Sequence, residues 1–392
     1  MRWLWCLFFL AACATSDAPV TPEKRYSAWG EVIPLAEAQQ VDAPALLLNV
    51  QDLSIAWLTT TPVDTYHTIN GTLLTIPTTD PYHQSLYPAD NAFKHLIWLD
   101  AAVDGDGMRI WSAWISPQET TERGPIPVSD RPSYRYAALP MPDQSLWLVW
   151  SGDLPGEPNL YSQFIDNHGR NRLPQRITSD ADFPAFAGNH LYWINVLNNT
   201  VHQADFANGM IDNDRELVQI PELYLGDWLL NFQVGQDQTH TYLVWNIQRA
   251  SGNVETWFSA GTGDDWMSPT RLGINPQPQT RFETGFNGGS ALTAVNGDVW
   301  LSWAAVLPGQ FLHFVMAAQA GNQLGVVYLK AGQVVGWQSV VTLELGLIGT
   351  PQLRTDRNLH LYLTWVDTSG YLNLTTTHPE IQHDMTRWFP PR

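Results

Sequence analysis

The feature that most constrains the fold is a three-residue signature, an aliphatic residue, any residue and then tryptophan, which recurs seven times. Successive copies lie 41 to 62 residues apart, a spacing typical of repeat architectures. The signature tryptophans are Trp57, Trp98, Trp150, Trp193, Trp245, Trp303 and Trp365. Aliphatic residues often continue the alternation upstream, as Leu146 does before Trp150, so each signature predicts a strand with the tryptophan and its aliphatic partners on one face.

Three further strands accompany most copies of the signature. One follows it after a turn that contains Gly, Pro or Asn, as at 108–111 and 254–258. Another carries Trp-x-x-Val/Pro-x-x-Leu, and a fourth precedes the signature and sometimes opens with proline. Four short strands in about 50 residues, repeated seven times, predict an all-β, seven-bladed β-propeller of four-stranded antiparallel blades. A blade cannot bury its faces alone, so stacking around an axis forms the core. A multi-sheet sandwich is the alternative.

The ends of the repeat region predict how the ring closes. The Trp-x-x-Val/Pro-x-x-Leu element at Trp29 precedes any complete blade, whereas the seventh blade, ending at 371–377, has three strands accounted for. An N-terminal strand near Trp29 is therefore expected to complete the last blade and remove both exposed edges. The tail around Trp388 is the alternative closing strand. The propeller is expected to span residues 28–392.

The first residues predict export from the cytoplasm. One arginine, an apolar run at 3–10 and small residues form a signal segment too short to span a bilayer. The tetrad at 10–13, Leu-Ala-Ala-Cys, resembles the lipobox of bacterial lipoproteins, which implies that residues 1–12 are removed and that Cys13 is lipidated. Residues 13–27 are then the lipidated cysteine and a flexible tether. An ordinary secretory signal is the alternative.

The lipobox resemblance also implies a location. The protein is expected at the cell envelope, on the outer membrane of a Gram-negative cell or otherwise on the outer face of the cell membrane, with its lipid anchor as the membrane contact. Asp and Glu number 38 against 20 Lys and Arg, which gives a formal net charge of −18. A nucleic-acid partner is excluded because phosphate binding needs clustered cations.

One stretch carries a second resemblance. Ser259-Ala-Gly-Thr-Gly-Asp-Asp-Trp266 is similar to the Asp box, Ser-x-Asp-x-Gly-x-x-Trp, of sialidase-like propellers. Gly261 stands where that family has its Asp. The resemblance implies a sialidase-like propeller, and in that family the Asp box is a folding element without a catalytic role.

The search for catalytic residues gives one enzymatic hypothesis. Standard hydrolase, metalloprotease and nucleotide-binding motifs are absent from the sequence. Three arginines fall on or near predicted inner strands of different blades and would face the channel. They are Arg135, Arg281 and Arg354. Sialidases hold a substrate carboxylate with three arginines and use a Tyr nucleophile assisted by Glu, so the resemblance implies a sialidase-type glycoside hydrolase with Tyr134 or Tyr136 and Glu283 nearby. Sialidases have six blades, whereas seven are counted here, and salt-bridged arginines are the alternative.

Ligand and metal sites have weaker signals. Five tryptophans lie off the signature positions and are candidates for stacking on sugar rings, with blade packing as the alternative. They are Trp111, Trp114, Trp147, Trp228 and Trp300. Asp104 and Asp106, in a Gly-rich turn, offer oxygen ligands for Ca²⁺, although a plain hairpin turn also explains them. No other cofactor is expected, because His378 and His383 are five residues apart and share no helix or strand face.

Together these features predict a lipid-anchored propeller that binds a glycan, a peptide or an envelope protein, as a binding or scaffold module. The sialidase-type glycosidase is the alternative function.

Overall fold

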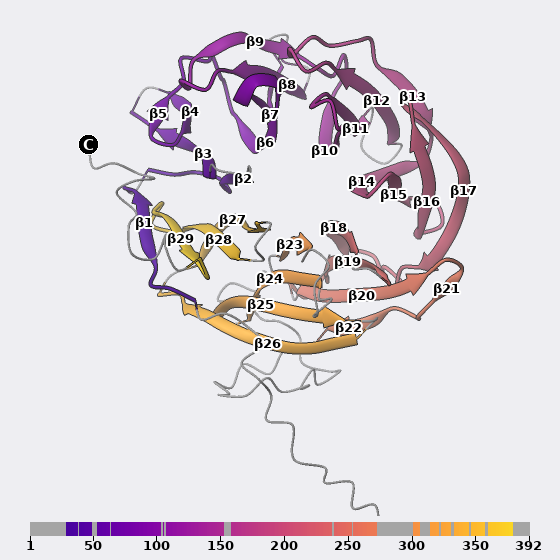
Figure 1. The fold of residues 1–392 in the computed structure, drawn as a ribbon. Coiled ribbons are helices and arrows are strands. Elements are labelled where there is room, and N and C mark those ends of the chain that lie inside the picture. Colours follow the sequence, from indigo (N-terminus) through magenta and orange to yellow (C-terminus); the bar gives the residue numbers. More distant parts are fainter. Residues whose placement is uncertain are drawn as a thin grey trace, which may run out of the picture.

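The computed structural model shows seven antiparallel sheets arranged in a ring (Figure 1). It describes residues 29–378 except 38, 49–52, 63, 103–104, 106, 153–157, 237–238, 253, 273–300, 306–313, 321–322, 331–332, 345 and 357–359. Apart from the short 3-10 turn η1 (Asp90–Ala92), every regular element of this described part is a strand. The predicted all-β, seven-bladed propeller is therefore confirmed.

The first four blades follow one another along the chain, each starting at its innermost strand. Blade 1 contains β2 (Ala45–Leu48), β3 (Leu53–Thr60), β4 (Thr65–Ile69) and β5 (Thr72–Leu73). Blade 2 contains β6 (Tyr82–Pro88), β7 (Lys94–Ala101), β8 (Met108–Ile115) and β9 (Thr121–Pro127). Blade 3 contains β10 (Ser133–Pro140), β11 (Leu146–Gly152), β12 (Asn159–Ile165) and β13 (Gln175–Thr178). Blade 4 contains β14 (Ala181–Ala187), β15 (His190–Asn195), β16 (Thr200–Ala207) and β17 (Met210–Gln219).

The remaining blades complete the ring. Blade 5 contains β18 (Trp228–Gln236), β19 (Thr241–Gln248), β20 (Val254–Thr262), β21 (Asp265–Trp266) and β22 (Thr270–Leu272), with β21 and β22 both paired to β20. Blade 6 contains β23 (Leu301–Ala305), β24 (Phe314–Ala320), β25 (Gln323–Lys330) and β26 (Gln333–Thr342). Blade 7 contains β27 (Leu347–Thr355), β28 (Leu361–Asp367) and β29 (Leu372–Thr376), and its outer strand is β1 (Ile33–Ala36).

Strand β1 closes the ring as predicted. It pairs antiparallel with β29, and Ile33 lies opposite Leu374. The backbone N–H of Gly30 donates to the carbonyl of Thr376 at 2.9 Å, which extends the pairing towards Trp29. Figure 1 shows this N-terminal strand beside the C-terminal strands of blade 7. The competing strand around Trp388 lies outside the described residues, as do the predicted signal segment, Cys13 and the tether.

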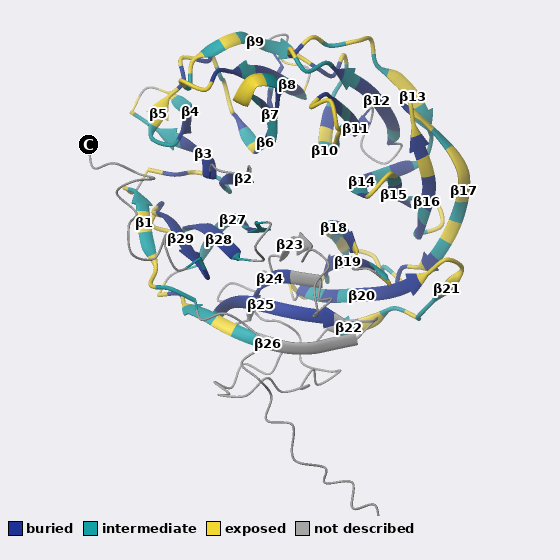
Figure 2. Ribbon diagram, viewed as in Figure 1, coloured by how far each residue is buried: buried dark blue, intermediate teal, exposed yellow. Residues whose placement is uncertain are grey.

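The core lies between the blades, where each signature tryptophan with a described side chain belongs to a cluster that includes the preceding blade. Trp98 of blade 2 shares a core cluster with Ile69 of blade 1, and Trp245 of blade 5 shares one with Val201 of blade 4. Trp57 of blade 1 shares a cluster with Leu374 of blade 7 in the same way. Figure 2 shows the burial concentrated in the middle strands of the blades. Stacking of blades thus buries the faces that no single blade covers.

Blade 6 carries its signature tryptophan at a different place among the described strands. In the other six blades the signature tryptophan lies on the second strand from the axis, whereas Trp303 lies on β23, the innermost of the four strands described for blade 6. Three long strands follow β23 and fill the second, third and outer positions.

Within the described residues no helix is long and apolar enough to cross a membrane.

The segment that resembles the Asp box forms a hairpin between β20 and β21. The Ser259 hydroxyl donates to the carbonyl of Met267 at 2.7 Å, and the Trp266 indole N–H donates to the carbonyl of Gly263 at 3.0 Å. A Cβ added at Gly261 would lie 2.4 Å from the Trp266 ring. The indole therefore occupies the space that the family's Asp side chain would need.

Candidate functional site

A cavity of about 530 Å³ lies at the centre of the ring. Its described lining comes from the first strands of six blades, β2, β6, β10, β14, β18 and β27, and from the segment before β2. These strands surround the axis in Figure 1. The cavity is therefore a property of the closed ring, since no single blade encloses it.

The first strands start irregularly, and this re-aims their side chains. Five of them, all except β2 and β23, have a register shift near the start. His83 on β6, Phe183 on β14 and Gly349 on β27 have positive φ there. At Gly349 a Cβ would lie 2.6 Å from the backbone nitrogen of Ala43, so glycine permits close contact with the segment that carries Asp42. Such bulges commonly redirect side chains at functional sites.

Asp42 and His83 meet at this end of the cavity. The backbone N–H of His83 donates to Asp42 Oδ2 at 2.5 Å. Burial raises the pKa of Asp42, although the N–H groups of His83 and Ala43 and the charge of His83 oppose the rise. Burial likewise lowers the pKa of His83. Both shifts are towards the uncharged forms, and the pair offers hydrogen-bonding groups to the cavity.

Tyr136 braces this corner from blade 3. Its hydroxyl donates to the carbonyl of His83 at 2.6 Å and lies 3.0 Å from Ser85 Oγ. The ring stands edge-on to the His83 imidazole, with centroids 5.2 Å apart. Burial raises the pKa of Tyr136 well above that of a free phenol. Its hydroxyl therefore stays protonated and engaged with β6.

The arginines of the clamp hypothesis have different partners. Arg135 on β10 forms a 3.0 Å ion pair with Asp182, and its guanidinium lies 3.9 Å from the centroid of the Phe183 ring. Arg354, near the other end of β27, lines the cavity, and its Nη1 donates to the carbonyl of Leu353 at 2.9 Å. Its charge opposes the rise that burial causes in the pKa of Tyr87. Arg281 and Glu283 lie outside the described residues, and Tyr134 is partly exposed at the start of β10.

Three of the off-signature tryptophans lie in blade packing. Trp111 packs on the core between blades 1 and 2, and Trp114 stacks on Phe93 with centroids 3.9 Å apart. Trp147 packs edge-on against Phe206 between blades 3 and 4, with ring centroids 5.8 Å apart. Trp300 lies outside the described residues.

Trp228 is different because it is exposed and begins a strand that lines the cavity. Its residue surface is 69% exposed, and it is the first residue of β18, whose Asn231 and Phe232 line the cavity. The loop before it carries Tyr224, 62% exposed, and Leu225, which is fully exposed. We call Tyr224, Leu225 and Trp228 the rim loop. Tyr224 and Leu225 had no repeat or motif in the sequence that would identify them.

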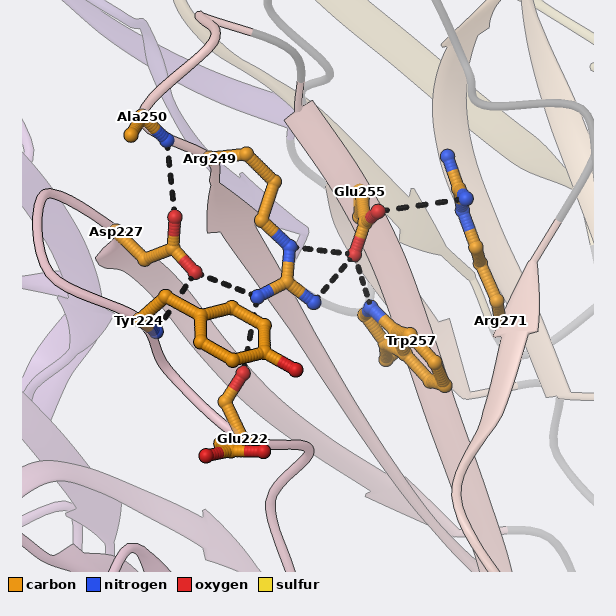
Figure 3. A network of polar contacts seen from close by, with 8 residues as sticks. All are labelled: Glu222, Tyr224, Asp227, Arg249, Ala250, Glu255, Trp257 and Arg271. Atoms are coloured by element: carbon orange, nitrogen blue, oxygen red, sulfur yellow. Dashed lines mark hydrogen bonds and ion pairs between the residues drawn. The ribbon is translucent and has the colours of Figure 1, made fainter.

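A polar network anchors the rim loop to blade 5 (Figure 3). Arg249 lies at its centre and binds Asp227 Oδ2 at 2.6 Å, the carbonyl of Glu222 at 3.0 Å and Glu255 Oε2 at 2.8 Å. The other oxygen of Asp227 accepts from the backbone N–H of Ala250 at 2.9 Å. The Asp227 side chain is only 3% exposed, so the rim loop rests on a mostly buried charge network.

The same network shifts the pKa of its carboxylates. The backbone N–H of Tyr224 and the guanidinium of Arg249 lower the pKa of Asp227. Burial alone would raise the pKa of Glu255, but hydrogen bonds from Arg249 and Trp257 and the charge of Arg271 lower it overall. The lowered pKa values favour the ionised form of both acids. Their ion pairs with Arg249 therefore hold the rim loop in place.

The proposed calcium ligands Asp104 and Asp106 lie outside the described residues. The glycines beside them close the β7–β8 hairpin. The N–H of Gly105 donates to the carbonyl of Ala102 at 2.9 Å, and the N–H of Ala102 donates to the carbonyl of Gly107 at 2.8 Å.

Comparisons with known proteins show the fold. No protein-family model matches the chain, and no curated protein matches its sequence. An α-L-arabinanase from Penicillium chrysogenum, solved with arabinobiose, superposes with a TM-score of 0.50 at 11% identity, covering 77% of this chain and 94% of that one. An ulvan lyase of polysaccharide lyase family PL25 gives a TM-score of 0.50 at 10% identity, covering 89% and 94%. The chain is a seven-bladed β-propeller with structural neighbours among glycoside hydrolases and polysaccharide lyases.

Proposed function

We propose that this propeller is an exported, lipid-anchored module of the cell envelope that binds a neutral glycan at the rim of its central cavity. One observation carries the proposal. The exposed indole of Trp228, on an anchored rim loop, begins the same strand that lines a polar cavity.

The two halves of this arrangement suit the two faces of a sugar. The apolar C–H face of a pyranose or furanose ring stacks on an exposed aromatic ring, as Trp228 provides. The hydroxyls need donors and acceptors, which Asp42, His83 and Asn231 provide in the cavity wall. Because Arg249 already anchors the rim loop, little conformational entropy is lost when a ligand binds. Preorganisation of this kind favours affinity for a small, weakly apolar ligand.

Charge selects among glycans. The chain has a net charge of −18, so long-range repulsion disfavours a polyanionic polysaccharide. Within the cavity, Asp42 is shifted towards its neutral form and Arg354 contributes a cation. The two structural neighbours, an arabinanase and an ulvan lyase, act on carbohydrates, which agrees with a sugar ligand here.

Glycan binding is tested with the full-length chain in detergent on a glycan array, followed by calorimetric titration of the best neutral oligosaccharide. Trp228→Ala is expected to weaken affinity about 10-fold, or ~1.4 kcal/mol. Trp147→Phe, a change in the blade core, is the matched control and should leave affinity unchanged. Equal affinity of wild type and Trp228→Ala would contradict the rim site, and binding of peptides or envelope proteins alone would replace the glycan as the ligand.

The lipid anchor has its own test. The lipobox at 10–13 and the polar tether after Cys13 support it. Mass spectrometry of the mature amino terminus should find an acylated Cys13. An unmodified terminus beyond Cys13 would contradict the anchor while leaving the glycan proposal intact.

A glycoside hydrolase is the second candidate, favoured by the raised pKa of Asp42 in the cavity. Glycoside hydrolysis ordinarily uses two carboxylates that flank the scissile bond. Among the described residues that line the cavity, Asp42 is the one carboxylate, and the nearby Asp182 is paired with Arg135. Binding is therefore favoured over hydrolysis. Release of reducing ends that Asp42→Asn abolishes would establish the hydrolase instead.

A further inference from the structure

Three potential metal ligands meet at the edge of blade 7, away from the rim loop. Asp356, His360 and His378 each offer one ligand atom, and these atoms all lie within 4.8 Å of one another. Among the described residues this is the one group of three or more His, Cys, Asp or Glu side chains placed this closely. We propose that these three residues bind a divalent transition-metal ion of the zinc type.

Strand pairing brings the three residues together. Asp356 directly follows β27, His360 directly precedes β28, and His378 comes two residues after β29. Since β28 pairs with both β27 and β29, these strand ends are neighbours. The N–H of Thr377 donates to the carbonyl of Leu361 at 3.0 Å, and the N–H of Leu361 donates to the Thr377 hydroxyl at 2.9 Å. The ligands therefore lie beside the ends of paired strands, a placement that favours a preorganised metal site.

The side chains already converge. His360 Nδ1 lies 2.8 Å from Asp356 Oδ2, and the backbone N–H of His360 donates to the other carboxylate oxygen at 2.9 Å. The rings of His360 and His378 have centroids 4.3 Å apart and planes at 56°. The side chains of Asp356 and His360 are 19% and 22% exposed, so an ion can enter from solvent and still be partly enclosed.

The chemistry of the donors selects the kind of ion. Two imidazoles and one carboxylate suit Zn²⁺ and its neighbours, whereas Ca²⁺ and Mg²⁺ prefer oxygen ligands alone. Zinc lies about 2.0–2.2 Å from N and O ligands in a tetrahedron, which places two ligands roughly 3.3 Å apart. The 2.8 Å contact between Nδ1 and Oδ2 would open by about half an ångström as the metal replaces the shared proton. Three protein ligands leave one position for water.

A phenol stands beside the carboxylate. The hydroxyl of Tyr362 donates to Asp356 Oδ2 at 3.3 Å. Burial and the charge of Asp356 raise the pKa of Tyr362, so it remains a donor. Partners of this kind orient the ligands of metal sites.

Other histidines of the chain show what a pair without a third ligand looks like. His190 lies 2.9 Å from Asp205, and His202 lies 2.9 Å from Asp214, through the same ring nitrogen. Neither pair belongs to a group of three potential ligands within the described part of the chain. The difference lies in His378, and it gives the experiment a matched control.

The site is separate from the proposed glycan rim. Gly349, near the start of β27, lies against Ala43 at the Asp42 end of the cavity, and Asp356 comes after the last residue of the same strand. Zinc binding and glycan binding are thus expected at opposite ends of β27, and each can be lost without the other.

The test is calorimetric titration of Zn²⁺ into the full-length, chelator-treated chain, with thermal unfolding in parallel. One tight site per chain is expected, with an unfolding midpoint that rises as zinc is added. His378→Gln should weaken zinc binding by more than the 10–100-fold that loss of an outer partner costs, and Tyr362→Phe should weaken it by about 10-fold. His190→Gln should leave it unchanged. Affinity should fall as the pH is lowered, because metal ligands must be deprotonated to bind.

Two outcomes would overturn the site. Equal zinc binding by wild type and His378→Gln would assign the ion to scattered surface histidines. Should His378→Gln fail to fold, Co²⁺ added to the wild-type chain decides, because bound Co²⁺ in a low-coordinate nitrogen and oxygen site absorbs visible light strongly. A spectrum like that of hydrated Co²⁺ would contradict the proposal.

Discussion

The first and second strands of the blades differ in burial and in regularity. In six blades the second strand carries a buried signature tryptophan and contributes to the core between blades. The first strands of five of these blades shift register near their start, and three of them have a residue with positive φ there. The repeated positions thus build the ring, and the irregular ones build the cavity and its rim. The predictions below test this division.

The largest expected effect separates two tryptophans. Trp150→Ala leaves a cavity between blades 2 and 3 and should lower the free energy of unfolding by about 3–5 kcal/mol. Trp228→Ala, on the exposed rim, should change it by less than about 0.5 kcal/mol. Chemical denaturation of both variants measures the contrast, and a comparable loss in Trp228→Ala would break the division.

The second prediction concerns His95 on the second strand β7. Burial lowers its pKa to about 4, although its hydrogen bond to the carbonyl of Gln144 opposes the change. Between pH 6.5 and 4 the unfolded chain binds a proton that the folded chain does not, so stability falls as pH falls through this window, by about 3 kcal/mol. His95→Gln should reduce the pH dependence by that amount. An unchanged pH profile would show that His95 is not buried as a neutral group.

The third prediction compares two glycines with positive φ. Gly349→Ala brings a Cβ to 2.6 Å from the Ala43 nitrogen and should cost about 2 kcal/mol of stability, since backbone strain and steric overlap add. Gly105→Ala has nothing within 4 Å of the added atom and should cost about 1 kcal/mol from backbone strain alone. Because Ala43 adjoins Asp42, only Gly349→Ala should also weaken glycan binding. Equal losses of stability in both variants would show that the close contact between Gly349 and Ala43 does not contribute.

The smallest effect is expected in the network below the rim loop. Arg249→Met leaves Asp227 and Glu255 without their shared cation and should lower the unfolding temperature by roughly 2–4 °C near neutral pH. The loss should shrink in acid, because both carboxylates have lowered pKa values and their contribution disappears as they protonate. Arg215→Met breaks a more exposed pair with Asp264 and should have no measurable effect. Thermal scans at two pH values distinguish the variants.

Much of the fold could be predicted because its evidence is local. Alternation around each signature tryptophan marks a strand, seven copies count the blades, and an unpaired strand near Trp29 predicts the closure that β1 makes. In blade 6 Trp303 lies on β23, the innermost described strand, and the stretch at 273–300, where an inner strand is expected, lies outside the described residues. Strand periodicity states which side chains share a face but not the distance of a strand from the axis.

The candidate sites were largely beyond such reasoning. Asp42 and His83 are 41 residues apart and meet because blades 1 and 2 adjoin. The alternation of side chains along a regular strand predicts which of them face the cavity. A register shift at His83 interrupts that alternation, so the rule does not apply there. Tyr224 and Leu225 belong to no repeat, and the arginines of the clamp hypothesis could be assigned to inner strands but not to partners.

By itself the sequence determined the kind of element, the number of blades and the need for a closed ring, because burial of apolar faces follows from residue order at short range. Tertiary structure alone decided which polar groups share one corner of the cavity and that His378 meets Asp356 and His360. Those contacts depend on strand register, on bulges and on closure of the ring. These are set only when strands that are distant in the sequence pair with one another.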